Sequence, residues 1–149
     1  MAVGSQSHEE RYAAVACGDG SVLMLLLDPR RSGGTAPPGR VSATKGGGST
    51  ASQAWVLGRE AGGHTYSASF VCFPSFRSDA SQLVSCGNDG RILVWDYGPY
   101  VAGEAAQPQV VAHAQQKRKI NWAATAAEPC ARVYVAETSA KLACYELRG

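Results

Sequence analysis

The sequence predicts an all-β fold made of antiparallel hairpins, and two observations support this prediction. Short runs of β-type residues repeatedly flank turn residues, as around Asp19-Gly20 and Asp89-Gly90. Asp-Gly between two apolar runs is the strongest short-range signal of a β-hairpin. No other segment carries a sustained apolar stripe of helical period. Three hairpins are therefore expected, within residues 11–27, 82–95 and 132–147.

The hairpins recur along the chain. When the repeats are aligned, Tyr145-Glu146 falls at the position of Trp95-Asp96, and the residues around the two pairs also align. A period of about 50 residues with several short strands per unit is typical of β-propeller blades. The sequence thus predicts a partial β-propeller of about three four-stranded antiparallel blades, with the first and last incomplete. We expect the blades at residues 11–58, 64–111 and 113–149.

The length of 149 residues bears on this architecture. Three blades fall below the four to eight of a closed ring, so the sequence looks like the C-terminal part of a longer propeller or a truncated product. Exposed sheet edges and blade faces would favour assembly. Within this single domain, Gly, Ser, Pro and Thr make up most of segment 29–53, which predicts a disordered loop there.

Charge and composition exclude several classes of protein. Fourteen basic and 12 acidic residues give a net charge of +2, which does not indicate a dedicated nucleic-acid binder. The longest aliphatic run, residues 22–27, is too short to span a bilayer, so no membrane association is expected. Five cysteines without a C-x-x-C pair favour a cytoplasmic or nuclear location, and neither a zinc site nor another metal or cofactor site is expected.

The central repeat carries a specific motif. Gly63-His64 opens the repeat and Trp95-Asp96 ends it, and Ser85 and Asp89 lie between these two pairs. This pattern resembles the WD-repeat (Trp-Asp repeat) β-propeller family. The resemblance implies four-stranded blades and a structural hydrogen-bonded tetrad of His64, Ser85, Asp89 and Trp95. Such a network would compensate the cost of burying a carboxylate and would fix the register of the strands.

The other two repeats depart from this pattern. The third keeps His113 at the histidine position but has Val135 and Tyr145 in place of the serine and tryptophan. The first keeps Asp19 but has Val15 at the serine position. We expect these two blades to depend on apolar packing and on the hydrogen bonds between strands.

Two groups of residues are candidates for function. His64, Ser85 and Asp89 could suggest a nucleophilic triad, but the tetrad accounts for all three together with Trp95, so no catalytic residue is expected. Partner binding is expected instead at a basic cluster and in the loop after Trp95-Asp96, whose two tyrosines are expected to be exposed. The candidate residues are Tyr97, Tyr100, Lys117, Arg118 and Lys119.

The resemblance implies a non-catalytic scaffold that presents loops to other proteins. Two alternatives remain open. Some family members are substrate receptors of cullin-RING ubiquitin ligases, and residues 83–96 resemble their adaptor-binding box, but Gly98 stands where that box ends with a basic residue. A propeller associated with nucleic acid or ribonucleoprotein would use residues 117–119, although three charges in a loop are usually only solvated.

Overall fold

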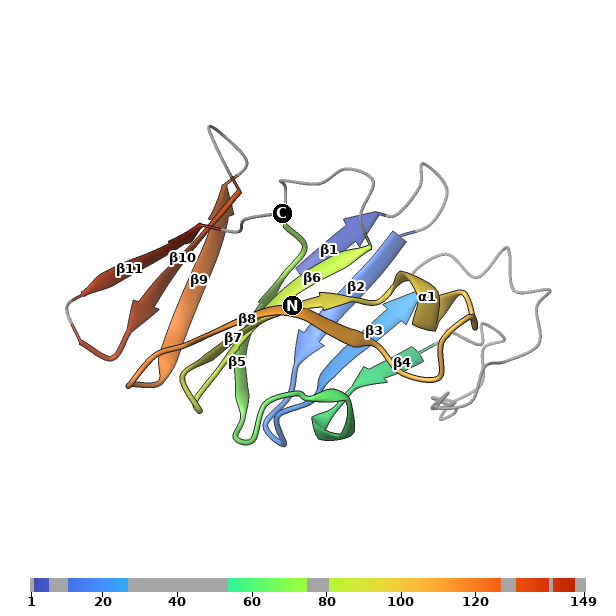
Figure 1. The fold of residues 1–149 in the computed structure, drawn as a ribbon, viewed down its shortest axis with the longest axis horizontal. Helices are drawn as coiled ribbons and strands as arrows, with labels where there is room; N and C mark the ends of the chain where they lie inside the picture. Colours follow the sequence, from blue (N-terminus) through green and yellow to red (C-terminus); the bar gives the residue numbers. More distant parts are fainter. Residues whose placement is uncertain are drawn as a thin grey trace, which may run out of the picture.

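The computed structural model describes residues 2–5, 11–26, 54–74, 81–126, 131–139 and 141–146. They form three antiparallel β-sheets, which confirms the predicted all-β fold (Figure 1). Segment 29–53 lies outside the described residues. Sheet 1 contains β1 (Ala2–Ser5), β2 (Arg11–Ala16), β3 (Val22–Leu26) and β4 (Ala54–Leu57). Sheet 2 contains β5 (Ala68–Cys72), β6 (Gln82–Gly87), β7 (Arg91–Asp96) and β8 (Gln109–Gln115). Sheet 3 contains β9 (Ile120–Ala126), β10 (Arg132–Glu137) and β11 (Leu142–Glu146).

The unit boundaries differ from those predicted. β1 pairs with β2, so sheet 1 has four strands and the prediction of an incomplete first blade beginning at residue 11 is wrong. This short strand carries almost no hydrophobic pattern, and its pairing depends on the free edge of β2. β8 continues to Gln115, past the expected boundary between the second and third units. Sheet 3 has three strands among the described residues, in agreement with an incomplete last unit.

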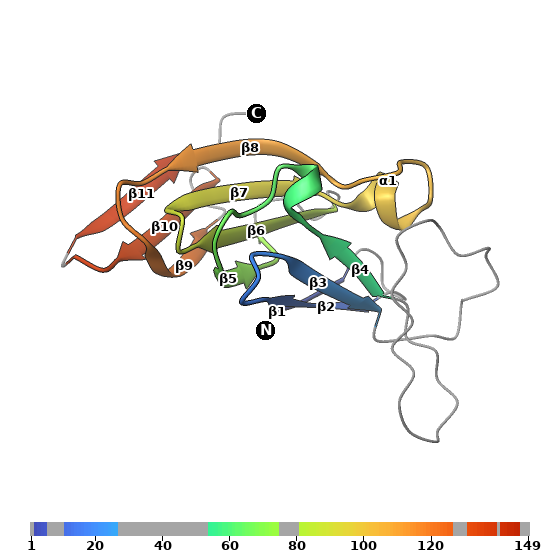
Figure 2. The same ribbon diagram turned by 90° about the horizontal axis from the view of Figure 1, so that it is seen from below.

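Sheet 2 lies between the other two sheets (Figure 2). Because side chains alternate along a strand, each face of sheet 2 buries its own set of residues. Leu83, Leu93 and Trp95 belong to the cluster shared with sheet 1. The opposite face contributes its residues to the cluster shared with sheet 3, and these residues are Val84, Cys86, Ile92 and Val94. The molecule is therefore a stack of three sheets with two apolar layers.

Two short helices complete the described part of the chain. The 3-10 helix η2 (Arg59–Ala61) lies between β4 and β5, and α1 (Gly98–Val101) follows β7. Neither is long and apolar enough to cross a membrane. The predicted Asp-Gly turns form as expected between β2 and β3 and between β6 and β7, with Gly20 and Gly90 at positive φ of 92° and 75°.

Candidate functional site

A continuous set of hydrogen bonds runs through sheet 2. His64 precedes β5, Ser85 lies on β6, Asp89 lies in the β6–β7 turn and Trp95 lies on β7. His64 Nε2 is 2.8 Å from Ser85 Oγ, and His64 Nδ1 is 3.0 Å from Asp89 Oδ1. The Trp95 indole N–H donates to Ser85 Oγ over 2.8 Å. The structure thus brings together the four residues that the sequence singled out.

The hydrogen-bond partners in this network indicate which of its atoms carry a proton. Ser85 Oγ accepts from Trp95, so its own O–H is free to donate to His64 Nε2. His64 Nδ1–H then donates to the Asp89 carboxylate. The backbone N–H groups of Thr65 and Arg91 also donate to Asp89, over 2.9 and 3.0 Å. A neutral imidazole with its proton on Nδ1 therefore satisfies every group.

Glycines make room for the network. A Cβ at position 87 would lie 2.5 Å from His64 Nδ1 and 2.7 Å from Asp89 Oδ1. At position 63 a Cβ would lie 2.5 Å from the Gly58 carbonyl oxygen. Contacts this short do not occur in folded proteins, so any side chain at Gly63 or Gly87 would displace the histidine loop. The Gly-His pair of the motif is thus explained by close packing.

Burial and hydrogen bonding set the charge states. Desolvation lowers the pKa of His64, although the hydrogen bond and charge of Asp89 act in the opposite direction. For Asp89, burial alone would raise the pKa, but hydrogen bonds from Arg91, Thr65 and His64 together hold it below its ordinary value. The site therefore holds a neutral imidazole beside a carboxylate.

These two shifts predict that the protein loses stability as the pH falls. The unfolded chain takes up a proton at His64 below about pH 6.5 and one at Asp89 below about pH 3.8, before the folded chain does. Each group thus stabilises the fold above its unfolded pKa, with a loss of at most about 1.4 kcal/mol per pH unit below it. Urea unfolding should be followed by tryptophan fluorescence between about pH 8 and pH 4. The urea concentration at the unfolding midpoint should decrease once the pH falls below about 6.5. An unchanged midpoint from about pH 7 to pH 5 would contradict the prediction for His64.

The arrangement of Ser85, His64 and Asp89 has the connectivity of a hydrolytic triad, but it gives a substrate no access. His64 and Ser85 are both 0% exposed. Ser85 Oγ accepts a hydrogen bond from the Trp95 N–H and donates its proton to His64 Nε2, and both partners lie against it in the buried core. A substrate carbonyl has no route to this oxygen, so the arrangement is suited to holding strands together and not to nucleophilic attack.

The two candidate tyrosines are buried, and the prediction that they are exposed is wrong. Tyr97 is 2% and Tyr100 4% exposed. Helix α1, which begins with Gly98-Pro99, turns the chain so that Tyr97 packs edge-on against Tyr12 and Phe73, with ring centroids 6.0 and 6.1 Å away. Burial raises the pKa of Tyr97 to about 12. Both rings therefore serve the packing between sheets 1 and 2.

The remaining candidates lie on the surface. Lys117, Arg118 and Lys119 are all exposed in the connection from β8 to β9. His113 is exposed within β8, opposite Leu93, so it does not occupy the position that the repeat assigned to it. The reason is that β8 extends through this residue, whereas the tetrad histidine lies in a loop before its sheet. Of the predicted partner-binding residues, Lys117–Lys119 thus remain available at the surface.

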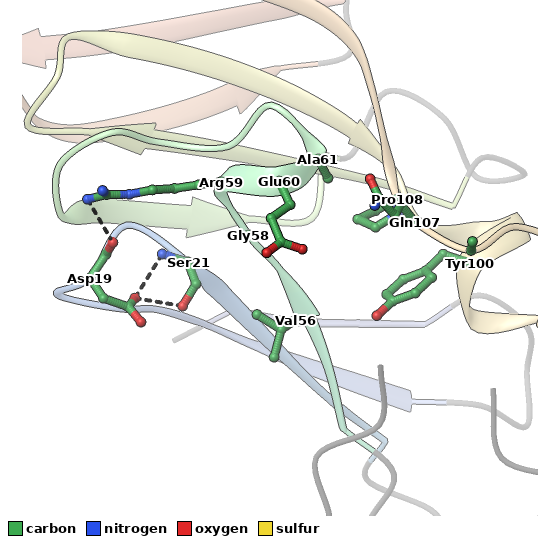
Figure 3. A pocket seen from close by; sticks show the side chains of 11 residues that line it. Asp19, Ser21, Val56, Gly58, Arg59, Glu60, Ala61, Tyr100, Gln107 and Pro108 are labelled. Carbon is green, nitrogen blue, oxygen red and sulfur yellow. Dashed lines mark hydrogen bonds between the residues drawn. The ribbon is translucent and has the colours of Figure 1, made fainter. Parts of the chain in front are cut away.

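A pocket that the sequence did not indicate lies beside β4. It has a volume of about 590 Å³ and is bounded by the β2–β3 turn, by η2 and by the segment that leads into β8 (Figure 3). Its lining residues are Asp19, Ser21, Val56, Gly58, Arg59, Glu60, Ala61, Tyr100, Ala106, Gln107 and Pro108. These residues come from separate segments of the chain, so no local sequence signal could have found them.

The charged groups of this pocket are arranged asymmetrically. Arg59 donates to the carbonyl oxygens of Thr65 and Asp19 and points along the rim. The Asp19 carboxylate accepts hydrogen bonds from the Ser21 N–H and hydroxyl, over 2.9 and 2.7 Å. The Glu60 carboxylate points into the pocket (Figure 3), and within the described part of the chain it makes no hydrogen bond or ion pair. The pocket therefore presents the Glu60 carboxylate beside the apolar surfaces of Val56 and Pro108.

No group of three or more His, Cys, Asp or Glu residues that could hold a metal ion occurs among the residues described in the structure. Comparison of the chain with protein-family models, with curated proteins and with solved structures found no match.

Proposed function

We propose that the chain is part of a WD-repeat β-propeller and acts as a non-catalytic scaffold for protein–protein interaction in the cytoplasm or nucleus. The buried network of His64, Ser85, Asp89 and Trp95 carries this proposal, since its residue types and spacing resemble that family. We infer further, from residues 64–76, 86–95, 119–122 and 145–147, that the chain resembles the C-terminal blades of WD repeat-containing protein 53. Three stacked antiparallel sheets support the same assignment.

The network also positions the pocket. Asp89 binds the backbone N–H of Thr65, and the carbonyl oxygen of Thr65 accepts a hydrogen bond from Arg59. Arg59 and Glu60 both belong to η2, so the tetrad fixes the helix that carries the Glu60 carboxylate. A preformed pocket loses little conformational entropy on binding. We infer that a segment of a partner protein binds here, with a basic side chain opposite Glu60 and an apolar one against Val56 and Pro108.

The pocket assignment is tested by exchanging one charge. Glu60→Arg should reduce the amount of bound partner about tenfold, because a like charge would then face the basic side chain. Glu104→Arg is the matched control, since Glu104 is exposed and does not line the pocket. Purified protein and both variants would be immobilised and incubated with cell extract, and the retained proteins quantified by mass spectrometry. Equal retention of the same proteins by wild type and Glu60→Arg would refute the pocket as the binding site.

Two further measurements separate the alternative functions. A nucleic-acid-associated protein would bind through the exposed cations Lys117, Arg118 and Lys119. In that case the retained proteins should be lost after nuclease digestion and in high salt. A ubiquitin-ligase receptor would retain the purified ligase adaptor directly at micromolar concentration. Gly98 opens α1 and its N–H donates to the Asp96 carboxylate, so no basic side chain projects from the position where the adaptor-binding box ends.

A further inference from the structure

The pocket beside β4 is one part of a longer groove. A second cavity, of about 650 Å³, is lined by residues 105–110, which lead into β8, and by two residues of η2. Five residues line both cavities, so the two are continuous, with η2 on one side and residues 105–110 on the other. The five shared residues are Glu60, Ala61, Ala106, Gln107 and Pro108.

The wall formed by residues 105–110 changes its hydrogen bonding along its length. At its start, the N–H groups of Glu104 and Ala105 donate to the Pro99 carbonyl oxygen over 2.8 and 3.0 Å. The next two residues, Ala106 and Gln107, are exposed and belong to no helix or strand. Neither makes a backbone hydrogen bond to another residue that the structure describes. Their main chain is therefore held at one end by the α1 segment and is available to a ligand.

β8 continues this wall at the edge of sheet 2. In the order β5-β6-β7-β8, it has a neighbouring strand on one side only within the described part of the chain. Its first two residues, Gln109 and Val110, line the groove. An edge strand presents unpaired N–H and C=O groups along its free side. An extended peptide can add to such an edge through main-chain hydrogen bonds.

The two parts of the groove offer different surfaces. Three alanines line the second part, and their short side chains leave the main chain accessible. The first part presents the Glu60 carboxylate beside Val56 and Pro108 (Figure 3). Arg59, which also lines the first part, donates to two backbone carbonyl oxygens. A ligand that matches both parts therefore supplies a bare main chain to one and a cation with an apolar group to the other.

We propose that the groove binds an extended segment of the partner protein, which pairs through its main chain with residues 106–110 and inserts one basic and one apolar side chain beside Glu60. This inference rests on the proposed function, since it names the kind of segment that occupies the same pocket. Alternate residues of an extended chain point to the same side. Because both side chains enter the first part of the groove, the basic and the apolar residue should lie two positions apart.

The test uses a library of random dodecapeptides displayed on phage and selected on the immobilised chain. The selected peptides should share a basic residue two positions from an apolar one. Isothermal titration of synthetic peptides should show binding to Glu60→Arg about tenfold weaker than to the wild type. Glu104→Arg should bind as the wild type does, because Glu104 lines neither part of the groove. Circular dichroism would establish that both variants are folded.

Main-chain pairing is tested on the wild-type protein, so this result does not depend on the folding of a variant. Each amide of the selected peptide is methylated in turn, which removes one N–H and leaves the side chains unchanged. Successive N–H groups of a strand point to opposite sides, so only every second one can pair with an edge. Methylation at alternate positions should therefore weaken binding about tenfold, and methylation at the intervening positions should have little effect.

The outcomes distinguish this inference from the proposed function. Peptides that bind Glu60→Arg as well as the wild type would overturn both the inference and the assignment of the pocket. Peptides that require Glu60 but tolerate methylation at every position would overturn the extended pairing alone. A library that yields no binding peptide would also overturn the inference. Retention of proteins from cell extract through Glu60 would in that case still support the proposed function, with a folded surface as the occupant.

Discussion

Replacing Asp89 by alanine is expected to lower the free energy of unfolding by about 2 kcal/mol. The side chain of Asp89 is 4% exposed and accepts hydrogen bonds from His64, Thr65 and Arg91. Its removal leaves these donors without their acceptor, and each buried unpaired donor costs about 1–3 kcal/mol. Because the β6–β7 turn lies near the surface, water would hydrogen-bond some of the donors that lose Asp89. The expected decrease in the free energy of unfolding is therefore smaller than the sum of the costs of three unpaired donors.

Asp19 provides a matched control in the same molecule. It occupies the equivalent turn position in sheet 1, but it is exposed, and among the described residues its carboxylate accepts hydrogen bonds from Ser21 alone. Asp19→Ala should therefore leave the unfolding midpoint almost unchanged. Urea unfolding of both variants, followed by circular dichroism, measures the difference. Equal midpoints for the two variants would show that the carboxylate of Asp89 contributes no more than an ordinary turn residue.

Local sequence predicted the hairpins and the relation between the tetrad residues. The alternation of side chains along a strand places Ser85 and Trp95 on one face of sheet 2, as the pairs Ser85–Leu93 and Leu83–Trp95 show. Asp89-Gly90 defined the turn between their strands, and both the sheet and the turn form as expected. These features could be predicted because each depends on residues close in sequence.

Features that depend on tertiary contacts could not be predicted. β1 forms only because β2 offers it an edge, and nothing within its own short sequence specifies a strand. Tyr97 and Tyr100 appeared to belong to an exposed loop, but Tyr97 is buried by Tyr12, which lies on β2 and is remote in the sequence. The pocket has the same origin, because its walls meet only after sheets 1 and 2 have packed.

The two buried tryptophans should respond differently to the same substitution. Trp95 is 0% and Trp55 2% exposed, and both belong to the cluster between sheets 1 and 2. Trp95→Phe removes ring volume and also the N–H that donates to Ser85, so we expect a loss of about 2–3 kcal/mol in the free energy of unfolding. The indole N–H of Trp55 has no hydrogen-bond partner within the described part of the chain. Trp55→Phe therefore removes a buried unpaired donor, and the loss should be about 1 kcal/mol or less.

A double-mutant cycle isolates the hydrogen bond from the packing. Trp95→Phe and Ser85→Ala remove the two ends of one bond, so their effects on the free energy of unfolding should be non-additive by about 1 kcal/mol. Trp55→Phe combined with Ser85→Ala serves as the control, and these two effects should add. Additive effects in both cycles would mean that Trp95 stabilises the sheet by volume alone. Coupling confined to the Trp95 cycle would establish that the indole N–H holds β7 to β6 and, through Ser85 and His64, to the loop that carries η2.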